Sequence, residues 1–187
     1  MNALRRLGGV ACVTIALAAF AGAPTERVAL ETNKGVIELE LYPDKAPVSV
    51  ANFLKYVDSG FYNGLIFHRV IAGFVIQAGG YDAKMVHRTS GPTIVNESSN
   101  RLHNTKGTIA MARLQNPNSA SAQFFINVAD NDNLDFRPGA PGYTVFGHVT
   151  AGMDVVERIA DVPTGDVDGM ADVPTEPVVI LSARRSP

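Results

Sequence analysis

The chain has 187 residues, of which 46% are hydrophobic and 18% charged, and its formal net charge is −2 at pH 7. A chain of this length and ordinary composition can bury a core without metals or disulfides, so a single globular domain is expected. The slight negative charge argues against a nucleic-acid-binding protein, which usually carries a basic patch and a high isoelectric point.

The N-terminus has the pattern of an export signal. Arg5 and Arg6 precede an apolar run over residues 7–20, and small residues follow the run. This order predicts a signal peptide over residues 1–23 that is cut near residues 21–23. The run is shorter than the roughly 20 residues that a membrane-spanning helix needs. An uncleaved interfacial anchor is the alternative reading.

Cys12 is the only cysteine, and it lies inside the apolar run. Cleavage would leave a mature domain without cysteine, which excludes disulfides, thiolate catalysis and cysteine-based metal sites. Such a chain suits an oxidising compartment. We therefore expect a periplasmic protein without a stable membrane anchor after cleavage, with secretion as the alternative. Lipid attachment at Cys12 is a further alternative, which the continuing apolar run disfavours.

Short strands dominate the predicted structure beyond the signal. Segments 27–32 and 36–41 alternate apolar and polar residues around a turn that contains glycine, which predicts a hairpin. Helices are predicted over residues 46–58, where apolar residues fall at i, i+3, i+4 and i+7, and over residues 153–160. The other predicted strands cover residues 65–70, 74–78, 108–112, 123–128, 144–149 and 177–184.

Long loops rich in Gly, Asn, Ser and Pro separate these strands, at residues 79–106, 113–122 and 129–142. Loops of this length inside one domain are often functional. Many short strands with two helices suit an antiparallel barrel, because closure removes the edges of a sheet. The sequence shows no strand–helix–strand alternation, which argues against a parallel doubly wound sheet.

Two adjacent predicted strands around Gly73 form the strongest candidate for a site. Because alternate residues of a strand share a face, Phe67 and Arg69 are expected on one side of the first strand. Val75 and Gln77 are likewise expected on one side of the second strand. Pairing of the two strands would bring an arginine, a glutamine and apolar groups onto one concave surface. A barrel wall whose arginine pairs with a carboxylate is the alternative reading.

Motifs for metal or cofactor chemistry are not recognisable in the sequence. The four histidines are scattered, and there is no H-E-x-x-H, G-x-S-x-G or P-loop motif. His68, next to Arg69, is expected to point away from it and to be structural. We therefore expect no metal and no cofactor, and a metal- or carboxylate-dependent hydrolase has no supporting motif.

Three ordered motifs resemble those of the cyclophilins. Residues 67–80 resemble the family's F-H-R-x-x-x-G-F-x-x-Q-x-G-[DG] run. Residues 107–126 resemble its G-x-[IL]-x-M-A run followed by S-Q-F-F-I, and residues 134–147 resemble L-D…V-F-G. The likeness spans residues 28–184. The signal peptide and an extended loop over residues 162–176 make the exported, periplasmic bacterial cyclophilins the most similar type.

This resemblance implies a fold and an activity. The fold would be mostly β, a closed antiparallel eight-stranded β-barrel capped by two α-helices, in a single domain over residues 24–187. The activity would be peptidyl-prolyl cis–trans isomerisation, which accelerates rotation about X–Pro bonds while exported proteins fold. The expected partners are proline-containing polypeptides that are unfolded or flexible, and the chain is expected to be a monomer.

The resemblance also implies roles for ten residues. Arg69 would stabilise the twisted amide, with Gln77 and Phe125 as the other members of the catalytic group. An apolar pocket would hold the proline ring, a polar wall would lie beside Arg69, and a short segment would meet the residue before proline. The residues that would bind substrate in these ways are Phe74, Val75, Ala112, Arg113, Gln123, Leu134 and Tyr143.

Several of these residues also have an alternative interpretation. Asn133 stands where many cyclophilins have tryptophan, which argues against tight binding of cyclosporin rather than against catalysis. Taken singly, Phe74 and Phe125 could be plain core, and Tyr143 could be an ordinary tyrosine at a barrel mouth. A cyclophilin-like module that binds proline-containing segments without isomerising them is the alternative function. The presence of Arg69 argues against this module.

Overall fold

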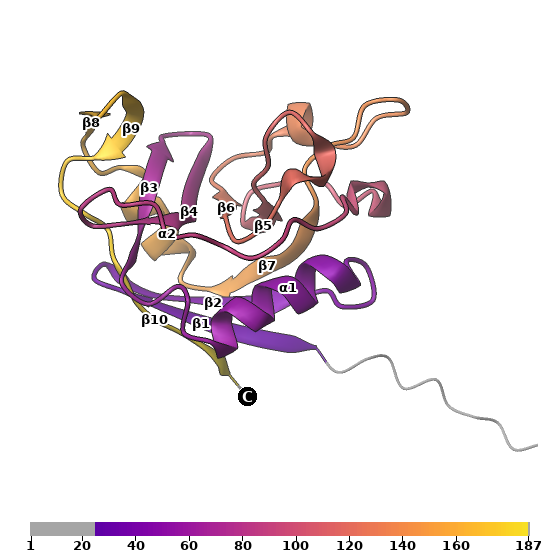
Figure 1. The fold of residues 1–187 in the computed structure, drawn as a ribbon, viewed down its shortest axis with the longest axis horizontal. Helices are drawn as coiled ribbons and strands as arrows, with labels where there is room; N and C mark the ends of the chain where they lie inside the picture. Colours follow the sequence, from indigo (N-terminus) through magenta and orange to yellow (C-terminus); the bar gives the residue numbers. More distant parts are fainter. Residues whose placement is uncertain (1–24, 187) are drawn as a thin grey trace, which may run out of the picture.

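The computed structural model describes residues 25–186, so the predicted signal peptide lies outside the described residues. None of the helices in this part of the chain is long and apolar enough to span a bilayer. The elements, shown in Figure 1, are β1 (Glu26–Thr32), β2 (Gly35–Leu41), α1 (Pro47–Asp58), β3 (Leu65–Ile71), β4 (Val75–Asp82), η1 (Ser98–Asn100), β5 (Thr108–Met111), η2 (Pro117–Ser119), β6 (Phe124–Asn127), η3 (Asp132–Leu134), β7 (Val145–Ala151), α2 (Met153–Ala160), β8 (Thr164–Val167), β9 (Met170–Pro174) and β10 (Ile180–Ser186).

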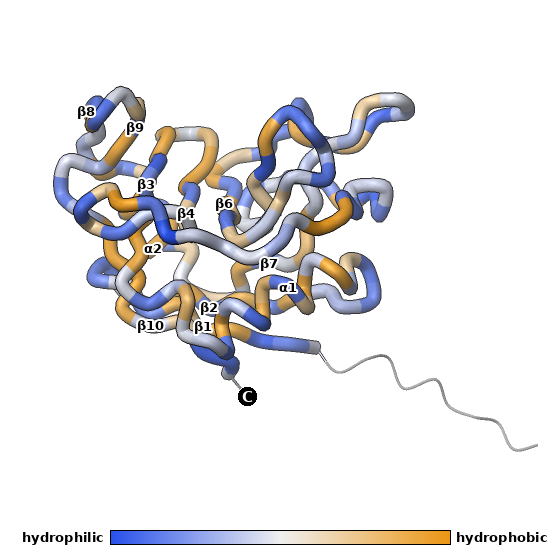
Figure 2. Tube along the Cα trace, viewed as in Figure 1, coloured by the Kyte–Doolittle hydropathy of each residue, from blue (hydrophilic) through white to orange (hydrophobic). Residues whose placement is uncertain are grey.

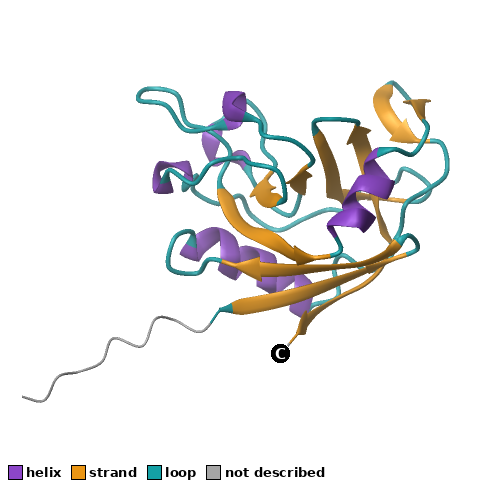
Figure 3. Ribbon diagram, turned by 180° about the vertical axis from the view of Figure 1, so that it is seen from behind, coloured by secondary structure: helices purple, strands orange, loops and turns teal. Residues whose placement is uncertain are grey.

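Eight strands form one curved antiparallel sheet in the order β10-β1-β2-β7-β5-β6-β4-β3. Helices α1 and α2, which lie apart from each other in Figure 3, both bury apolar residues in the core that this sheet encloses. The prediction of a mostly β fold with two helices is therefore confirmed. The observed strands and helices lie close to the predicted segments, although β4 runs on to Asp82, into the segment predicted to be a loop.

The predicted closure of the barrel is wrong, because the sheet is an open half-barrel. Its edge strands β3 and β10 meet only near one bridge, between Ile66 and Val179. The amide of Phe67 donates to the carbonyl of Val178 at 2.9 Å beside this bridge. β10 begins at Ile180 and then pairs along β1, so the two edge strands never run side by side.

The segment 162–176, predicted as an extended loop, contains the separate hairpin of β8 and β9. β9 lies beside β3, near the open edge of the sheet (Figure 1). Figure 2 shows hydrophobic residues along part of β9, and its last residues, Val173 and Pro174, are buried. The hairpin is therefore anchored on the body of the molecule rather than standing free of it.

The main core lies between the inner face of the sheet and the two helices α1 and α2. Apolar residues of α1 recur at helical spacing, and Phe53, at the centre of this pattern, is fully buried. The ring of Phe53 lies 5.3 to 5.4 Å from the rings of Tyr62, Phe124 and Phe146. Aromatic contacts of this kind add specific geometry to a large burial of apolar area.

The N-terminus of α1 is capped by a residue distant in the sequence. Glu97 accepts hydrogen bonds from the amides of Val48 and Ser49, at 3.0 and 2.8 Å, and from the Ser49 hydroxyl at 2.7 Å. A carboxylate suits this position because the first amides of a helix lack partners and carry partial positive charge. The cap fixes the long loop between β4 and β5 to the helix.

A bulge in β3 determines which face carries the candidate arginine. Phe67 pairs with Ala78 and Arg69 pairs with Gln77, so two residues, His68 and Arg69, stand against one on β4. Phe67 therefore faces the main core, and Arg69 faces the opposite side. The prediction that Phe67 and Arg69 share a face is wrong, because the extra residue breaks the alternation of the strand.

His68 is buried by this bulge and is 2% exposed. Its ring packs against Tyr81, with ring centroids 4.9 Å apart, and its Nδ1 has no hydrogen-bond partner among the described residues. Burial lowers the pKa of His68 to about 4. The neutral ring is thus part of the wall of the fold, in agreement with the structural role expected for it.

The burial of His68 predicts a loss of stability in acid. An unfolded histidine has a pKa of about 6.5. Between this value and the folded value the unfolded state binds more protons, so the free energy of unfolding should decrease by about 3 kcal/mol as the pH falls from 7 to 4. His68→Phe should remove this part of the decrease. An NMR titration of the His68 ring should have its midpoint near pH 4, and a midpoint near 6.5 would contradict the buried placement.

Candidate active site

One row of paired residues crosses the sheet and carries the candidate site. Arg69 of β3 lies opposite Gln77 of β4, and Gln77 lies opposite Phe125 of β6. Phe125 in turn pairs with Ala110 of β5, which pairs with Val145 of β7. Directly paired residues of antiparallel strands share a face. The arginine, the glutamine and the apolar residues therefore lie on one surface, as the sequence predicted.

A cavity of about 150 Å³ lies over this row. Among residues 25–186, the lining consists of nine of the ten predicted site residues, namely Arg69, Phe74, Val75, Gln77, Ala112, Arg113, Phe125, Leu134 and Tyr143. The tenth, Gln123, lines a neighbouring cavity of about 340 Å³ together with Gln77. The structure thus brings all ten residues into two adjoining hollows.

The apolar wall of the site is a second, smaller core. Val75, Ala110, Phe125 and Val145 are buried together, apart from the main core. Phe125 is 4% exposed, and the ring of Tyr143 meets it edge-on, with centroids 5.6 Å apart. Taken singly, Phe125 could be interpreted from the sequence as plain core, and the structure shows that Val75 and Phe125 are both packed in this cluster and part of the cavity lining.

The polar wall consists of Gln77 and Gln123. The side-chain amide of Gln77 donates to Oε1 of Gln123 at 2.8 Å. Gly80 makes room for this pair, because a Cβ atom there would lie 2.7 Å from Cδ of Gln123. Glycine at this place in β4 therefore serves close side-chain packing rather than an unusual backbone angle.

Arg69 stands at the edge of the cavity with its head group partly in water. Its side chain is 39% exposed. Its one ion pair among the described residues joins Nε to Oδ2 of Asp172, which is 40% exposed, at 3.7 Å. This contact lies at the surface and is longer than a hydrogen bond. The terminal nitrogens of the guanidinium therefore remain available to a bound amide.

The side chain of Arg113 has a role that the sequence did not predict. Its guanidinium lies over the ring of Tyr143, with Cζ 4.5 Å from the ring centroid. It also donates to the carbonyls of Pro141, Gly142 and Leu114, at 2.7, 3.3 and 2.9 Å. The resemblance implied that Arg113 meets the residue before proline. Its side chain in addition holds the loop that carries Tyr143.

Comparison with known proteins agrees with this geometry. The family model of the cyclophilin type peptidyl-prolyl cis-trans isomerase/CLD matches residues 27–185. A peptidyl-prolyl cis-trans isomerase of Acinetobacter baylyi is 53% identical over 157 residues, which are 84% of this chain and 84% of the relative. Peptidyl-prolyl cis-trans isomerase B of Escherichia coli is 51% identical over 158 residues, which are 83% of this chain and 96% of the relative.

A solved structure is similar as well. The cyclophilin type peptidyl-prolyl cis-trans isomerase of Cryptosporidium parvum has a TM-score of 0.73 at 25% identity, covering 87% of this chain and 98% of that one. The chain belongs to the cyclophilin family. Isomerisation of the peptide bond before proline is therefore its activity, as the motifs predicted.

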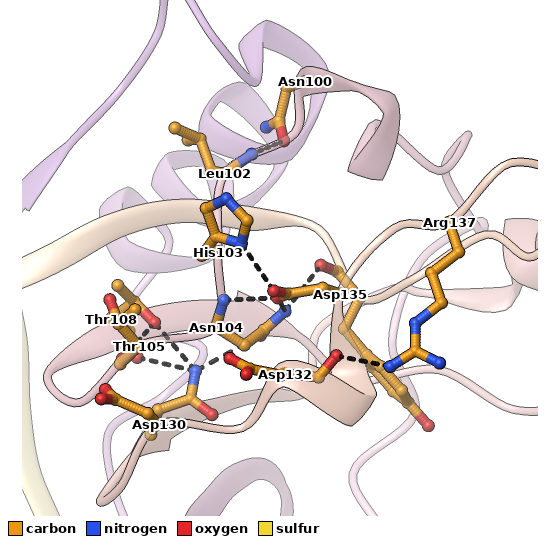
Figure 4. Close-up of polar contacts among 12 residues, drawn as sticks. Asn100, Leu102, His103, Asn104, Thr105, Thr108, Asp130, Asp132, Asp135 and Arg137 are labelled. Atoms are coloured by element: carbon orange, nitrogen blue, oxygen red, sulfur yellow. Dashed lines mark hydrogen bonds and ion pairs between the residues drawn. The ribbon is translucent and has the colours of Figure 1, made fainter.

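A buried polar network lies behind the cyclophilin pocket. Asn131 donates to the carbonyl of Phe74 at 3.0 Å and to Oδ1 of Asn127 at 2.7 Å. Asn127 donates to Oδ1 of Asn104 at 3.3 Å, and the Asn104 backbone amide donates to Asp135 at 2.7 Å. Figure 4 shows Asn104 and His103 converging on Asp135. The network joins the segments before β4, after β6 and before β5.

This network positions pocket residues without touching the cavity itself. Asp135 directly follows Leu134, whose carbonyl accepts a hydrogen bond from the amide of Tyr143 at 2.8 Å. The network was not predicted from the sequence, although the aspartate of the L-D motif was one signal of it. Its asparagines come from separate loops, so their contacts depend on the fold.

His103 and Asp135, at the edge of this network, favour the charged forms of each other. His103 Nδ1 lies 2.7 Å from Oδ2 of Asp135, and this hydrogen bond and the carboxylate charge raise the pKa of His103. Burial raises the pKa of Asp135, but hydrogen bonds from the Asn104 backbone, His103 and the Asn104 side chain outweigh it, so the net pKa is lowered. Within residues 25–186, no three His, Cys, Asp or Glu side chains come together to hold a metal ion.

The packing of Gly80 predicts a specific loss of activity. Gly80→Ala should push the flexible Gln123 side chain away from Gln77 and lower kcat/KM roughly tenfold, which corresponds to about 1.4 kcal/mol. Gly165→Ala is the matched control, because its nearest neighbour would be Cγ2 of Thr175 at 3.9 Å. Isomerase kinetics and thermal unfolding of both variants test this. Equal kinetics for the two variants would contradict the role of the polar wall.

Proposed function

We propose that this cyclophilin accelerates X–Pro isomerisation by binding the amide more tightly when it is twisted than when it is planar. Arg69 supplies the hydrogen-bond donor, and the hollow formed by Phe74, Val75, Phe125 and Leu134 holds the proline ring. The observation that carries the proposal is the shared cavity, which Arg69 and the apolar residues line together along one cross-strand row.

The chemistry of the X–Pro amide explains why a hydrogen-bond donor and an apolar pocket are sufficient for catalysis. Conjugation gives the amide a rotation barrier of about 18–20 kcal/mol. No covalent bond is made or broken on passing it. Conjugation is lost in the twisted transition state, and the prolyl nitrogen becomes pyramidal and regains a lone pair. A donor placed at this nitrogen binds the transition state and not the planar ground state, which is the condition for catalysis.

Arg69 suits this role because a guanidinium stays charged, is planar and carries several donors. The buried apolar wall excludes water from one side of the contact, which strengthens a hydrogen bond to developing charge. An acceleration on the order of 10⁵ requires about 7 kcal/mol. One charged hydrogen bond supplies about 1.5–3 kcal/mol. Positioning of the ring and of the preceding carbonyl must supply the rest.

Proline-containing polypeptides are the proposed substrates. The Cryptosporidium parvum relative was also solved in the presence of the dipeptide Ala-Pro, with a TM-score of 0.72 and 26% identity. A module that only binds such segments does not need a guanidinium beside the ring pocket. The placement of Arg69 in the cavity therefore favours isomerisation over binding alone. We propose that the chain acts as a monomer on flexible segments of exported proteins.

The proposed location is the periplasm, reached by means of the N-terminal signal peptide. The support is the sequence pattern of Arg5 and Arg6, the apolar run and the small residues after it. Exported proteins fold in that compartment, and slow X–Pro isomerisation, taking roughly 10–100 s without a catalyst, limits such folding.

Replacement of Arg69 tests the catalytic proposal. Arg69→Ala should lower kcat/KM on the order of 10²-fold, which corresponds to about 3 kcal/mol, because the transition state loses its donor. Arg69→Lys keeps the charge but loses the planar fork, and should recover little. Arg184→Ala, an exposed arginine on β10, is the control. A protease-coupled proline-peptide assay measures the effect, and near wild-type activity of Arg69→Ala would refute the role.

Processing of the N-terminus tests the proposed location. The protein released from the periplasm of its host should begin at residues 22–24 by N-terminal sequencing. Leu17→Arg should interrupt the apolar run and leave an uncleaved chain in the cytoplasmic fraction. Recovery of the wild-type chain with residues 1–23 intact would contradict export by cleavage.

A further inference from the structure

The hairpin of β8 and β9 brings a carboxylate to the edge of the active site. Gly165 pairs with Val173 and Val167 pairs with Met170, so two residues of β9 stand against one of β8. The second residue of this bulge is Asp172, whose φ of +63° is in the left-handed region. Bulges of this kind redirect a side chain, and they recur next to active sites.

The base of the hairpin is fixed, so the position of Asp172 is defined. Val173 is buried, and β9 lies beside β3, the strand that carries Arg69. The amide and hydroxyl of Thr175 both donate to the carbonyl of Pro163, at 2.9 and 3.2 Å, which closes the base. The carboxylate of Asp172 lies 3.7 Å from Nε of Arg69 as a result.

We propose that Asp172 is a positioning residue for Arg69. This proposal rests on the proposed function, in which the guanidinium binds the twisted amide. An arginine side chain has many rotamers, and a guanidinium has two usable edges. A carboxylate beside Nε attracts one edge and leaves the terminal nitrogens for the cavity. The observed distance is that of a loose contact, which orients the head group and still lets it move onto the substrate.

We expect the contact between Asp172 and Arg69 to increase the rate of isomerisation rather than the stability of the fold. An exposed ion pair contributes little to the free energy of unfolding. Correct placement of a catalytic group, in contrast, has a large effect on the chemical step. Loss of Asp172 should therefore lower kcat and leave the fold and the KM of the peptide almost unchanged.

Asp168 provides a matched control within the same hairpin. Its φ is +51°, also in the left-handed region, and it is exposed and forms no ion pair among the described residues. Asparagine tolerates left-handed backbone well. Asp172→Asn and Asp168→Asn thus remove the same charge from the same hairpin with the same backbone demand, and only the first removes the contact with Arg69.

The experiment measures kcat and KM of both variants, and the Nε–Hε NMR signal of Arg69. Asp172→Asn should lower kcat between roughly threefold and tenfold with KM within about twofold, and should shift or broaden the Arg69 signal. Asp168→Asn should match the wild type in all three. Equal behaviour of the two variants, a higher kcat for Asp172→Asn, or an effect on KM alone would overturn the proposal.

Two further measurements keep the outcome decisive. Arg69→Ala in the same series separates the two claims: if Arg69→Ala stays active, the proposed function of Arg69 fails, whereas loss of activity in Arg69→Ala beside an unaffected Asp172→Asn overturns only the role of Asp172. If Asp172→Asn unfolds the hairpin, the effect of salt on kcat and on the Arg69 signal of the wild-type protein provides the test instead. Screening by about 1 M NaCl should shift the Arg69 signal and lower kcat, because the pair is exposed. Invariance of both would overturn the proposal.

Discussion

The active site depends on the one-residue bulge in β3. With regular alternation, Arg69 would share a face with Phe67, inside the main core, where a guanidinium without a partner is very costly. The extra residue turns Arg69 to the opposite face and places it against Gln77. The neutral, buried ring of His68 occupies the wall at this point. One irregularity in the backbone thus decides which face of the sheet carries Arg69.

The rest of the sheet makes this surface rigid. The two faces of the strands bury two separate apolar clusters, and Phe125 belongs to the smaller one, which is also the wall of the cavity. Behind it, buried amides fix the segments that carry Phe74 and Leu134. Fully paired buried polar groups specify one arrangement, whereas partly paired ones would not. The reaction needs position and polarity rather than a nucleophile, and this fold supplies both from its framework.

The sequence predicted the composition of the site better than its geometry. Arg69, Gln77 and Phe125 were predicted as site residues because they lie in motifs that resemble those of the cyclophilins, and the structure places them in one row. The bulge at His68 was not predictable, since register depends on the partner strand. The hairpin around Asp172 was hidden by its many Gly, Asp and Pro residues and few apolar ones. The open edge of the sheet was missed because closure depends on how long two distant strands stay side by side.

A crystal structure of this cyclophilin with a bound proline-containing peptide tests the central claim most directly. The account predicts the proline ring against Phe125 and Leu134, with a terminal nitrogen of Arg69 within about 3 Å of the prolyl amide group. It also predicts that the residue before proline lies toward Ala112. A proline ring bound in the neighbouring hollow beside Gln123, or an Arg69 head group turned away from the bound amide, would contradict it.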